Sequence, residues 1–164
     1  MKIPQADDVA KIIDLPLAIA DGFDNPEALS SRYHFDRRQA SYYLQATEIL
    51  GLTKRATKGR HALSGRGQRF VDLTPTKRKL ALVHAMLSLP VMQTILHELA
   101  ASPSHRLNRS RLSKIASSRT GISGSTVQRR ITCLIGWARW LADETLLFEV
   151  GDDSISTARD VKSN

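Results

Sequence analysis

One pattern of helix-forming and turn-forming residues occurs twice in this chain, 87 residues apart. The segment from Glu27 to Leu44 aligns without a gap with the segment from Lys114 to Ile131, and both contain Ser-Ser-Arg. Only three of eighteen residues are identical, but the apolar positions agree: Ala28, Leu29, Phe35, Ala40 and Leu44 align with Ile115, Ala116, Ile122, Val127 and Ile131. Because apolar spacing determines which helix faces are buried, the sequence predicts that one small fold is built twice.

Capping and turn residues predict where the helices and strands of each copy begin and end. Asn25 with Pro26, and also Asp36, are typical of helix starts, whereas Gly51 is typical of a helix end. The elements predicted for the first copy are helices at 8–20 (kinked or broken at Pro16), 26–32 and 36–50, and a hairpin at 52–64 that turns at Lys58-Gly59. The elements predicted for the second copy are helices at 74–87, 90–100, 108–118 and 123–141, and a short strand at 146–150.

The order helix, helix, turn, helix, hairpin is that of a winged helix. The stretch HALSGRGQRFVDL, from His61 to Leu73, resembles the second wing strand and the following helix of that superfamily. The segment from Thr76 to Leu99 resembles the helical connector between paired winged helices in the DNA-recognition regions of some type II restriction enzymes. These resemblances imply a mainly α fold of two tandem winged-helix domains, joined by a helical connector and carrying short β-hairpin wings.

The expected division of the chain follows from these elements. We expect a first winged-helix domain in residues 1–73, a helical connector with the start of the second domain in 74–103, the second winged-helix domain in 104–151, and a flexible acidic tail in 152–164. The tail contains too few apolar residues to pack. Two copies in one chain remove the need for a homodimer without forbidding one.

The charge of the chain favours a polyanionic partner. Its 24 Lys and Arg residues against 16 Asp and Glu give a net charge of +8 and a pI of about 10.1. The excess is concentrated in residues 76–142, which carry +10, whereas residues 1–75 carry +2 and residues 143–164 carry −4. A cationic chain with helix-turn-helix spacing is expected to bind double-stranded DNA.

Each repeated helix has a polar side opposite its apolar stripe. The stripe of the helix from Ser123 consists of Val127, Ile131, Leu134, Ala138 and Leu141. Side chains of the two polar sides can pair with base edges in the major groove, so the predicted base-contacting residues are Arg38, Ser41, Tyr42, Gln45, Ser125, Gln128, Arg129 and Thr132. The predicted phosphate-binding residues are Arg37, Lys54, Arg55, Lys58, Arg60 and Arg130. The alternative is that both polar sides are only solvated and that the hairpin cations keep an exposed edge soluble.

No residue pattern typical of an enzyme or a metal site is found in the sequence. The single Cys133 excludes an internal disulfide and lacks the pattern of a nucleophile, and the five His residues lack metal-ligand spacing. A nuclease needs clustered carboxylates with a Lys, and the only acid-x-Lys match is Asp160-Val161-Lys162 in the expected tail. We therefore expect no catalytic residue, metal or cofactor in this chain, and any nuclease domain is expected outside it.

Three functions remain after these exclusions. The chain is a sequence-specific DNA-recognition module of a restriction or defence system, a free-standing winged-helix transcription regulator, or a winged-helix protein-interaction module. A nuclease encoded beside the chain favours the first, and an operator in its own promoter favours the second. The third predicts no salt-sensitive affinity for DNA. The sequence has no signal peptide and no clear membrane span, so we expect a soluble cytoplasmic protein.

Overall fold

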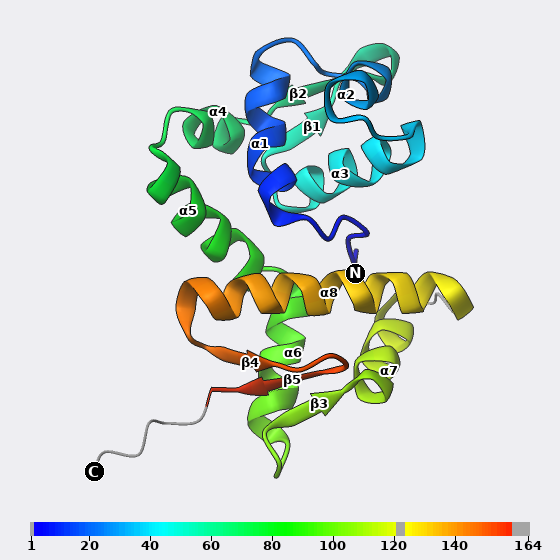
Figure 1. Cartoon of the computed structure of the whole chain (residues 1–164), viewed down its shortest axis with the longest axis vertical. Coiled ribbons are helices and arrows are strands. Elements are labelled where there is room, and N and C mark those ends of the chain that lie inside the picture. Colours follow the sequence, from blue (N-terminus) through cyan, green and yellow to red (C-terminus); the bar gives the residue numbers. More distant parts are fainter. Residues whose placement is uncertain (1, 121–123, 159–164) are drawn as a thin grey trace. The chain divides into compact units, whose positions relative to one another are not determined.

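The computed structural model describes residues 2–120 and 124–158 of the chain (Figure 1). This part is mainly helical, with two small antiparallel sheets. It divides into an N-terminal unit, Pro4–Leu87, and a C-terminal unit, Ser88–Asn164 together with Met1–Ile3. Each unit contains an apolar core of its own.

The N-terminal unit begins with three helices that have side-chain caps, two of them at the predicted residues Asn25 and Asp36. Its elements are α1 (Val9–Ala20), α2 (Pro26–Tyr33), α3 (Arg37–Ile49), β1 (Thr53–Arg55), the 3-10 turn η1 (Thr57–Gly59), β2 (His61–Leu63), α4 (Gly65–Val71) and α5 (Pro75–Leu87). The side chains of Asp8, Asn25 and Asp36 accept backbone N–H bonds in the first turns of α1, α2 and α3. These caps satisfy N–H groups that have no partner within the helix.

The interruption expected at Pro16 does not break α1. The helix continues through Pro16, which is itself buried together with Ile12, Leu15 and Ile19. Proline removes one N–H donor from the helix interior, but the packing of this apolar face maintains the helical backbone.

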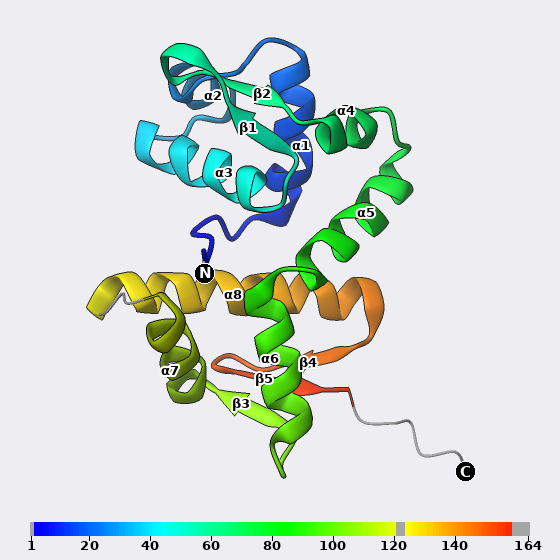
Figure 2. The same ribbon diagram turned by 180° about the vertical axis from the view of Figure 1, so that it is seen from behind.

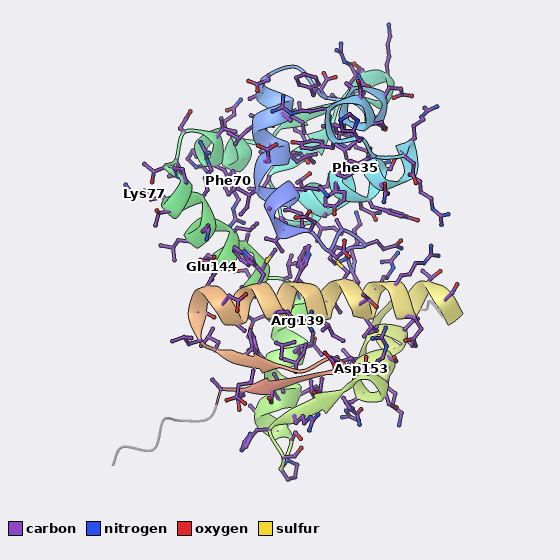
Figure 3. All side chains as sticks on the ribbon, in the orientation of Figure 1. Phe35, Phe70, Lys77, Arg139, Glu144 and Asp153 are labelled. Carbon is purple, nitrogen blue, oxygen red and sulfur yellow. The ribbon has the colours of Figure 1, made fainter. Side chains whose placement is uncertain are left out.

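An aromatic stack fixes the turn between α2 and α3. The Phe35 ring lies between the rings of Tyr33 and Tyr43, with centroid distances of 5.3 and 4.9 Å. Figure 3 shows Phe35 beside α3 in the N-terminal unit. The Tyr33 hydroxyl donates to the Asp14 carboxylate on α1, and burial together with this neighbouring negative charge raises the pKa of Tyr33. The end of α2 is therefore held against α1, and the turn after it is held against α3.

The hairpin and α4 are joined by a close backbone contact. β1 pairs antiparallel with β2, so that Thr53 lies opposite Leu63. Gly67 on α4 is buried against Leu52, and a β carbon at Gly67 would lie 1.9 Å from the Leu52 carbonyl oxygen. Only glycine allows α4 to pack so closely against the start of the hairpin.

Helix α5 belongs to the N-terminal unit. It packs against α1 and α4, and the Arg78 guanidinium donates to the carbonyl oxygens of Phe70 and Val71 at 3.3 and 2.7 Å. The structure thus divides the chain at residues 87 and 88 rather than through a separate connector over residues 74–103. The reason is that Arg78 satisfies carbonyl groups at the end of α4, which ties the following helix to it.

The C-terminal unit combines three helices with a three-stranded sheet. Its elements are α6 (Pro90–Ala101), β3 (Arg106–Asn108), α7 (Arg109–Thr120), α8 (Gly124–Thr145), β4 (Phe148–Val150) and β5 (Ser154–Thr157). The sheet order is β3-β5-β4, with both pairings antiparallel. Helix α6 crosses one face of this sheet, behind it in Figure 1 and in front of it in Figure 2. The predicted cap Ser123, like Ile122 of the sequence alignment, lies outside the described residues.

Two strands of this sheet were not predicted. The expectation of a flexible tail from residue 152 is wrong for Ser154–Thr157, which form the central strand β5. Ile155 is fully buried and lies opposite Leu107 of β3 and Val150 of β4. Hydrogen bonds to two neighbouring strands and the buried apolar side chain of Ile155 thus order a segment whose composition is otherwise polar.

The apolar stripe of α8 is confirmed. Its predicted members are all buried in the C-terminal core: Val127, Ile131, Leu134, Ala138 and Leu141. Trp137 is fully buried as well, so it is a packing residue of this core. The opposite side of α8 is exposed at Ser125 and Arg129.

Candidate nucleic-acid interface

The polar side of α3 carries the predicted base-contacting residues of the first copy. Arg38 and Ser41 are exposed, whereas Tyr42 and Gln45 are partly exposed. The capping box at the start of α3 fixes their position, because Asp36 accepts from the Gln39 N–H and its own N–H donates to the Gln39 side chain. The capping box therefore fixes the backbone of the first turn of α3, from which the Arg38 side chain projects.

Arg38 and Tyr42 form a pair on this exposed side. The Arg38 Nε–H donates to the Tyr42 hydroxyl at 2.5 Å, and the guanidinium carbon lies 5.6 Å from the centre of the Tyr42 ring. Ser41 is less available, since its hydroxyl donates back to the Arg37 carbonyl at 2.9 Å. The Gln45 side chain has no hydrogen bond to any other described residue.

The hairpin adds a row of cations beside α3. Lys54 and Arg55 lie on β1, Lys58 lies at the turn with a positive φ of 57°, and Arg60 precedes β2. All four side chains are exposed. Lys54 and Lys58 have no ion pair among the described residues, so their positive charges are not compensated by a neighbouring carboxylate.

Three of the predicted phosphate-binding residues meet at one depression. Arg37, Lys58 and Arg60 line a hollow of about 490 Å³ together with Asn25, Pro26, Glu27 and Gly59. These residues come from the start of α2, the start of α3 and the hairpin turn. The tertiary structure thus brings together cations that are separated by about twenty residues in the sequence.

Acidic residues accompany the arginines of this surface. Arg37 pairs with Glu27, Arg55 Nε lies 3.2 Å from Glu48, and Arg60 Nε lies 2.9 Å from Asp24. These arginine side chains are 75%, 76% and 59% exposed, whereas the Glu48 and Asp24 side chains are only 19% and 20% exposed. Each guanidinium is therefore accessible to solvent, which weakens its ion pair by screening. The exposed guanidinium groups thus remain open to a further anion such as phosphate.

His61 lies at the base of the hairpin. Its Nδ1 atom is buried without a hydrogen-bond partner and lies 4.0 Å from the Glu48 carboxylate, while its backbone N–H donates to the Asp24 carbonyl at 2.7 Å. Burial lowers the pKa of His61, and the charge of Glu48 only partly opposes this effect. The neutral imidazole is thus a structural part of the hairpin rather than a further cation.

The polar side of α8 differs from that of α3 because a long-range contact occupies it. Arg109 Nε donates to Gln128 Oε1 at 3.0 Å, and Arg109 Nη2 donates to Thr132 Oγ1 at 2.8 Å. Arg109 Nη1 also lies 2.8 Å from the Asp153 carboxylate in the turn between β4 and β5. Two of the four residues predicted to contact bases in the second copy are therefore bound within the unit. Sequence reasoning missed Arg109, which lies outside the repeated segments.

Two further features of the C-terminal unit differ from the prediction of a phosphate-binding surface: the contact of Arg130 and the charge of the turn between β4 and β5. Arg130 is partly buried, and its Nη1 donates to the Ile3 carbonyl at 2.6 Å, so this guanidinium holds the N-terminal segment instead of facing outward to phosphate. The turn between β4 and β5 carries Asp152 and Asp153, and Figure 3 labels the latter. A negatively charged turn opposes phosphate, whereas the hairpin of the N-terminal unit attracts it.

The described residues contain no group of three or more His, Cys, Asp or Glu side chains placed to hold a metal ion. No single helix in this part of the chain has both the length and the hydropathy needed to cross a membrane, and only α5 and α6 taken together reach those values.

Comparison with known proteins gives one family. A model described as "Domain of unknown function (DUF7226)" matches residues 11–145, which extend from α1 to the end of α8. No curated protein and no solved structure matches the chain.

Proposed function

We propose that this chain, which belongs to the DUF7226 family of domains of unknown function, binds double-stranded DNA through its N-terminal unit. The observation that carries the proposal is the convergence of Arg37, Lys58 and Arg60 on one hollow beside the exposed side of α3. Cations grouped around a helix that presents polar side chains are suited to hold a duplex by its phosphates while the helix contacts base edges.

We further propose that both units are winged helices. In the N-terminal unit the order α1, α2, α3, β1, β2 supports this assignment, with α3 as the recognition helix and the β1–β2 hairpin as the wing. In the C-terminal unit, the order α6, β3, α7, α8, β4, β5 and the sheet order β3-β5-β4 support it, with α8 in the recognition position.

The two units are proposed to differ in function. In the C-terminal unit, the side chains of Gln128 and Thr132 accept hydrogen bonds from Arg109. The turn in the wing position of this unit is acidic, with Asp152 and Asp153. We assign base contacts to Arg38, Tyr42 and Gln45 of α3 and none to the C-terminal unit. Ser125 and Arg129 of α8 are exposed, but the acidic turn of this unit opposes the approach of phosphate. The sequence supplied candidate base-contacting residues on both copies, and this proposal keeps only those of α3.

Sequence-specific recognition within a restriction or defence system is the biological setting that we propose. Its support is the sequence resemblance of Thr76 to Leu99 to the connector of certain restriction enzymes, although the structure divides this segment between α5 of the N-terminal unit and α6 of the C-terminal unit. In this setting the chain binds DNA and leaves catalysis to a nuclease outside it. A free-standing transcription regulator would use the same DNA-binding surface.

A salt titration tests DNA binding directly. Affinity for a mixed-sequence duplex, measured by fluorescence anisotropy, is expected to fall linearly on a log–log plot with a slope of about −0.9 per phosphate contact. The variant Lys54→Ala/Lys58→Ala is expected to make the slope about 1.8 less negative, since two contacts are lost. The matched control Arg66→Ala/Arg69→Ala removes the same charge from exposed positions of α4 and is expected to leave most of the slope unchanged. A flat salt response would refute DNA binding and favour a protein-interaction module.

A further inference from the structure

We infer that Arg38 contacts guanine in the major groove and that Tyr42 is the residue that positions it. The inference rests on the proposed binding of DNA by α3. It adds which base is recognised, which atoms of the protein recognise it, and how the side chain is held ready before DNA arrives.

The hydrogen bond from Arg38 Nε to the Tyr42 hydroxyl leaves the outer edge of the guanidinium available. Tyr42 lies one helical turn after Arg38, so both side chains project from the same side of α3. With Nε engaged at 2.5 Å, the N–H groups of Nη1 and Nη2 have no partner among the described residues. These two nitrogens form a planar fork whose direction is set by the contact with the phenol.

Arg38 also differs from its neighbours in charge. Arg37, Arg55 and Arg60 each pair with a carboxylate, whereas Arg38 is held by a neutral hydroxyl. The carboxylates of Glu48 and Asp24 also engage Nε, but they offset the positive charge of Arg55 and Arg60, whereas the Tyr42 hydroxyl orients Arg38 and leaves its full charge for the acceptors of a base edge. The other three arginines are placed for phosphate instead.

Guanine is the base that matches this fork. Its major-groove edge presents two adjacent acceptors, O6 and N7, and each can accept one N–H from the outer edge of an arginine. Adenine presents an acceptor beside an amino donor, so one arm of the fork would face another donor. Arg38 is the second residue of α3, and the start of a recognition helix is the part that approaches base edges in helix-turn-helix proteins.

The test uses the full chain and duplexes selected by it from a random library. In the selected sequence, each guanine is replaced in turn by 7-deazaguanine, which keeps base pairing but lacks the N7 acceptor. The proteins compared are the wild type, Arg38→Ala, Arg38→Lys and Tyr42→Phe, with Arg69→Ala as an exposed arginine control on α4. Thermal melting of each variant establishes that it is folded.

At one guanine, 7-deazaguanine is expected to weaken wild-type binding by about 5- to 150-fold, the range of a good bidentate contact. Arg38→Ala is expected to lose affinity for the selected duplex and to become insensitive to 7-deazaguanine at that same position. Arg38→Lys should keep its affinity for random duplex and lose part of the discrimination, because its ammonium group can donate to N7 but lacks the planar fork that Tyr42 orients. Tyr42→Phe should melt like the wild type and lose part of the discrimination at the same guanine only.

Two results would overturn the inference, and they are distinguishable. If Arg38→Ala remains as sensitive as the wild type to 7-deazaguanine at every position, Arg38 does not contact guanine, although DNA binding by the chain still stands. If the wild type shows no salt-sensitive binding to any duplex, the proposed function fails and this inference fails with it. Equal discrimination by Tyr42→Phe and the wild type would remove the positioning role of Tyr42.

Discussion

Arg109 and Asp153 form an ion pair at 2.8 Å that joins the start of α7 to the turn between β4 and β5, 44 residues later in the chain. The same guanidinium binds Gln128 and Thr132, so one side chain links two helices and a turn of the C-terminal unit. This network is the clearest structural difference between the polar sides of the two repeated helices.

Breaking this network is expected to affect stability rather than DNA binding. In a double-mutant cycle, Arg109→Ala and Asp153→Ala should show a coupling of about 0.2 to 1 kcal/mol in urea unfolding, the range of exposed ion pairs. Affinity of Arg109→Ala for the selected duplex should change no more than that of Arg111→Ala, a neighbouring α7 arginine that pairs with Glu98. A selective loss of base discrimination in Arg109→Ala would show that the C-terminal unit contacts bases after all.

A cavity in the C-terminal core is expected to cost far more. Ile131 is fully buried, and Ile131→Ala should lower the free energy of unfolding by about 2 to 5 kcal/mol. Ser125→Ala, at an exposed position of the same helix, should stay within about 0.5 kcal/mol of the wild type. Chemical denaturation of both variants measures the difference, and similar losses would contradict the assignment of the two helix sides.

Two glycines of α4 provide a matched pair. In Gly67→Ala the new β carbon would meet the Leu52 carbonyl oxygen at 1.9 Å, so α4 must move away from the hairpin. We expect a loss of about 1 to 3 kcal/mol and a lower melting temperature. At Gly65 the nearest contact is the end of the flexible Arg69 side chain at 4.0 Å, and Gly65→Ala should be neutral or slightly stabilising. Equal melting temperatures for the two variants would argue against the close contact.

His61 is expected to make stability depend on pH. Because burial lowers its folded-state pKa below the ordinary value of 6.5, the unfolded chain binds the proton more readily. The stability associated with the neutral imidazole is complete above the unfolded pKa and decreases as the pH falls below it toward the lowered folded pKa. Melting temperatures between pH 8 and pH 5 should therefore decline more steeply for the wild type than for His61→Gln. Parallel curves would mean that His61 is not the group responsible.

Local signals in the sequence determined most of the helices. Asn25 and Asp36 accept the N–H groups of nearby residues, and Gly51 adopts the positive φ of 73° that ends a helix. The buried stripe of α8 was equally readable from its spacing. These features depend on residues a few positions apart, so they can be predicted without knowledge of the tertiary contacts.

The function of individual side chains was decided by partners that are distant in the sequence. Ile155 forms part of a central strand only because β3 and β4 lie on both sides of it, and Arg130 turns inward because the Ile3 carbonyl is beside it. Arg109 likewise binds Gln128 and Thr132 on the polar side of α8. On α3, by contrast, no described residue binds the Nη1 and Nη2 groups of Arg38. Two helices with the same pattern thus differ in what they can bind, since hydrogen-bonding capacity depends on which groups the fold has already satisfied.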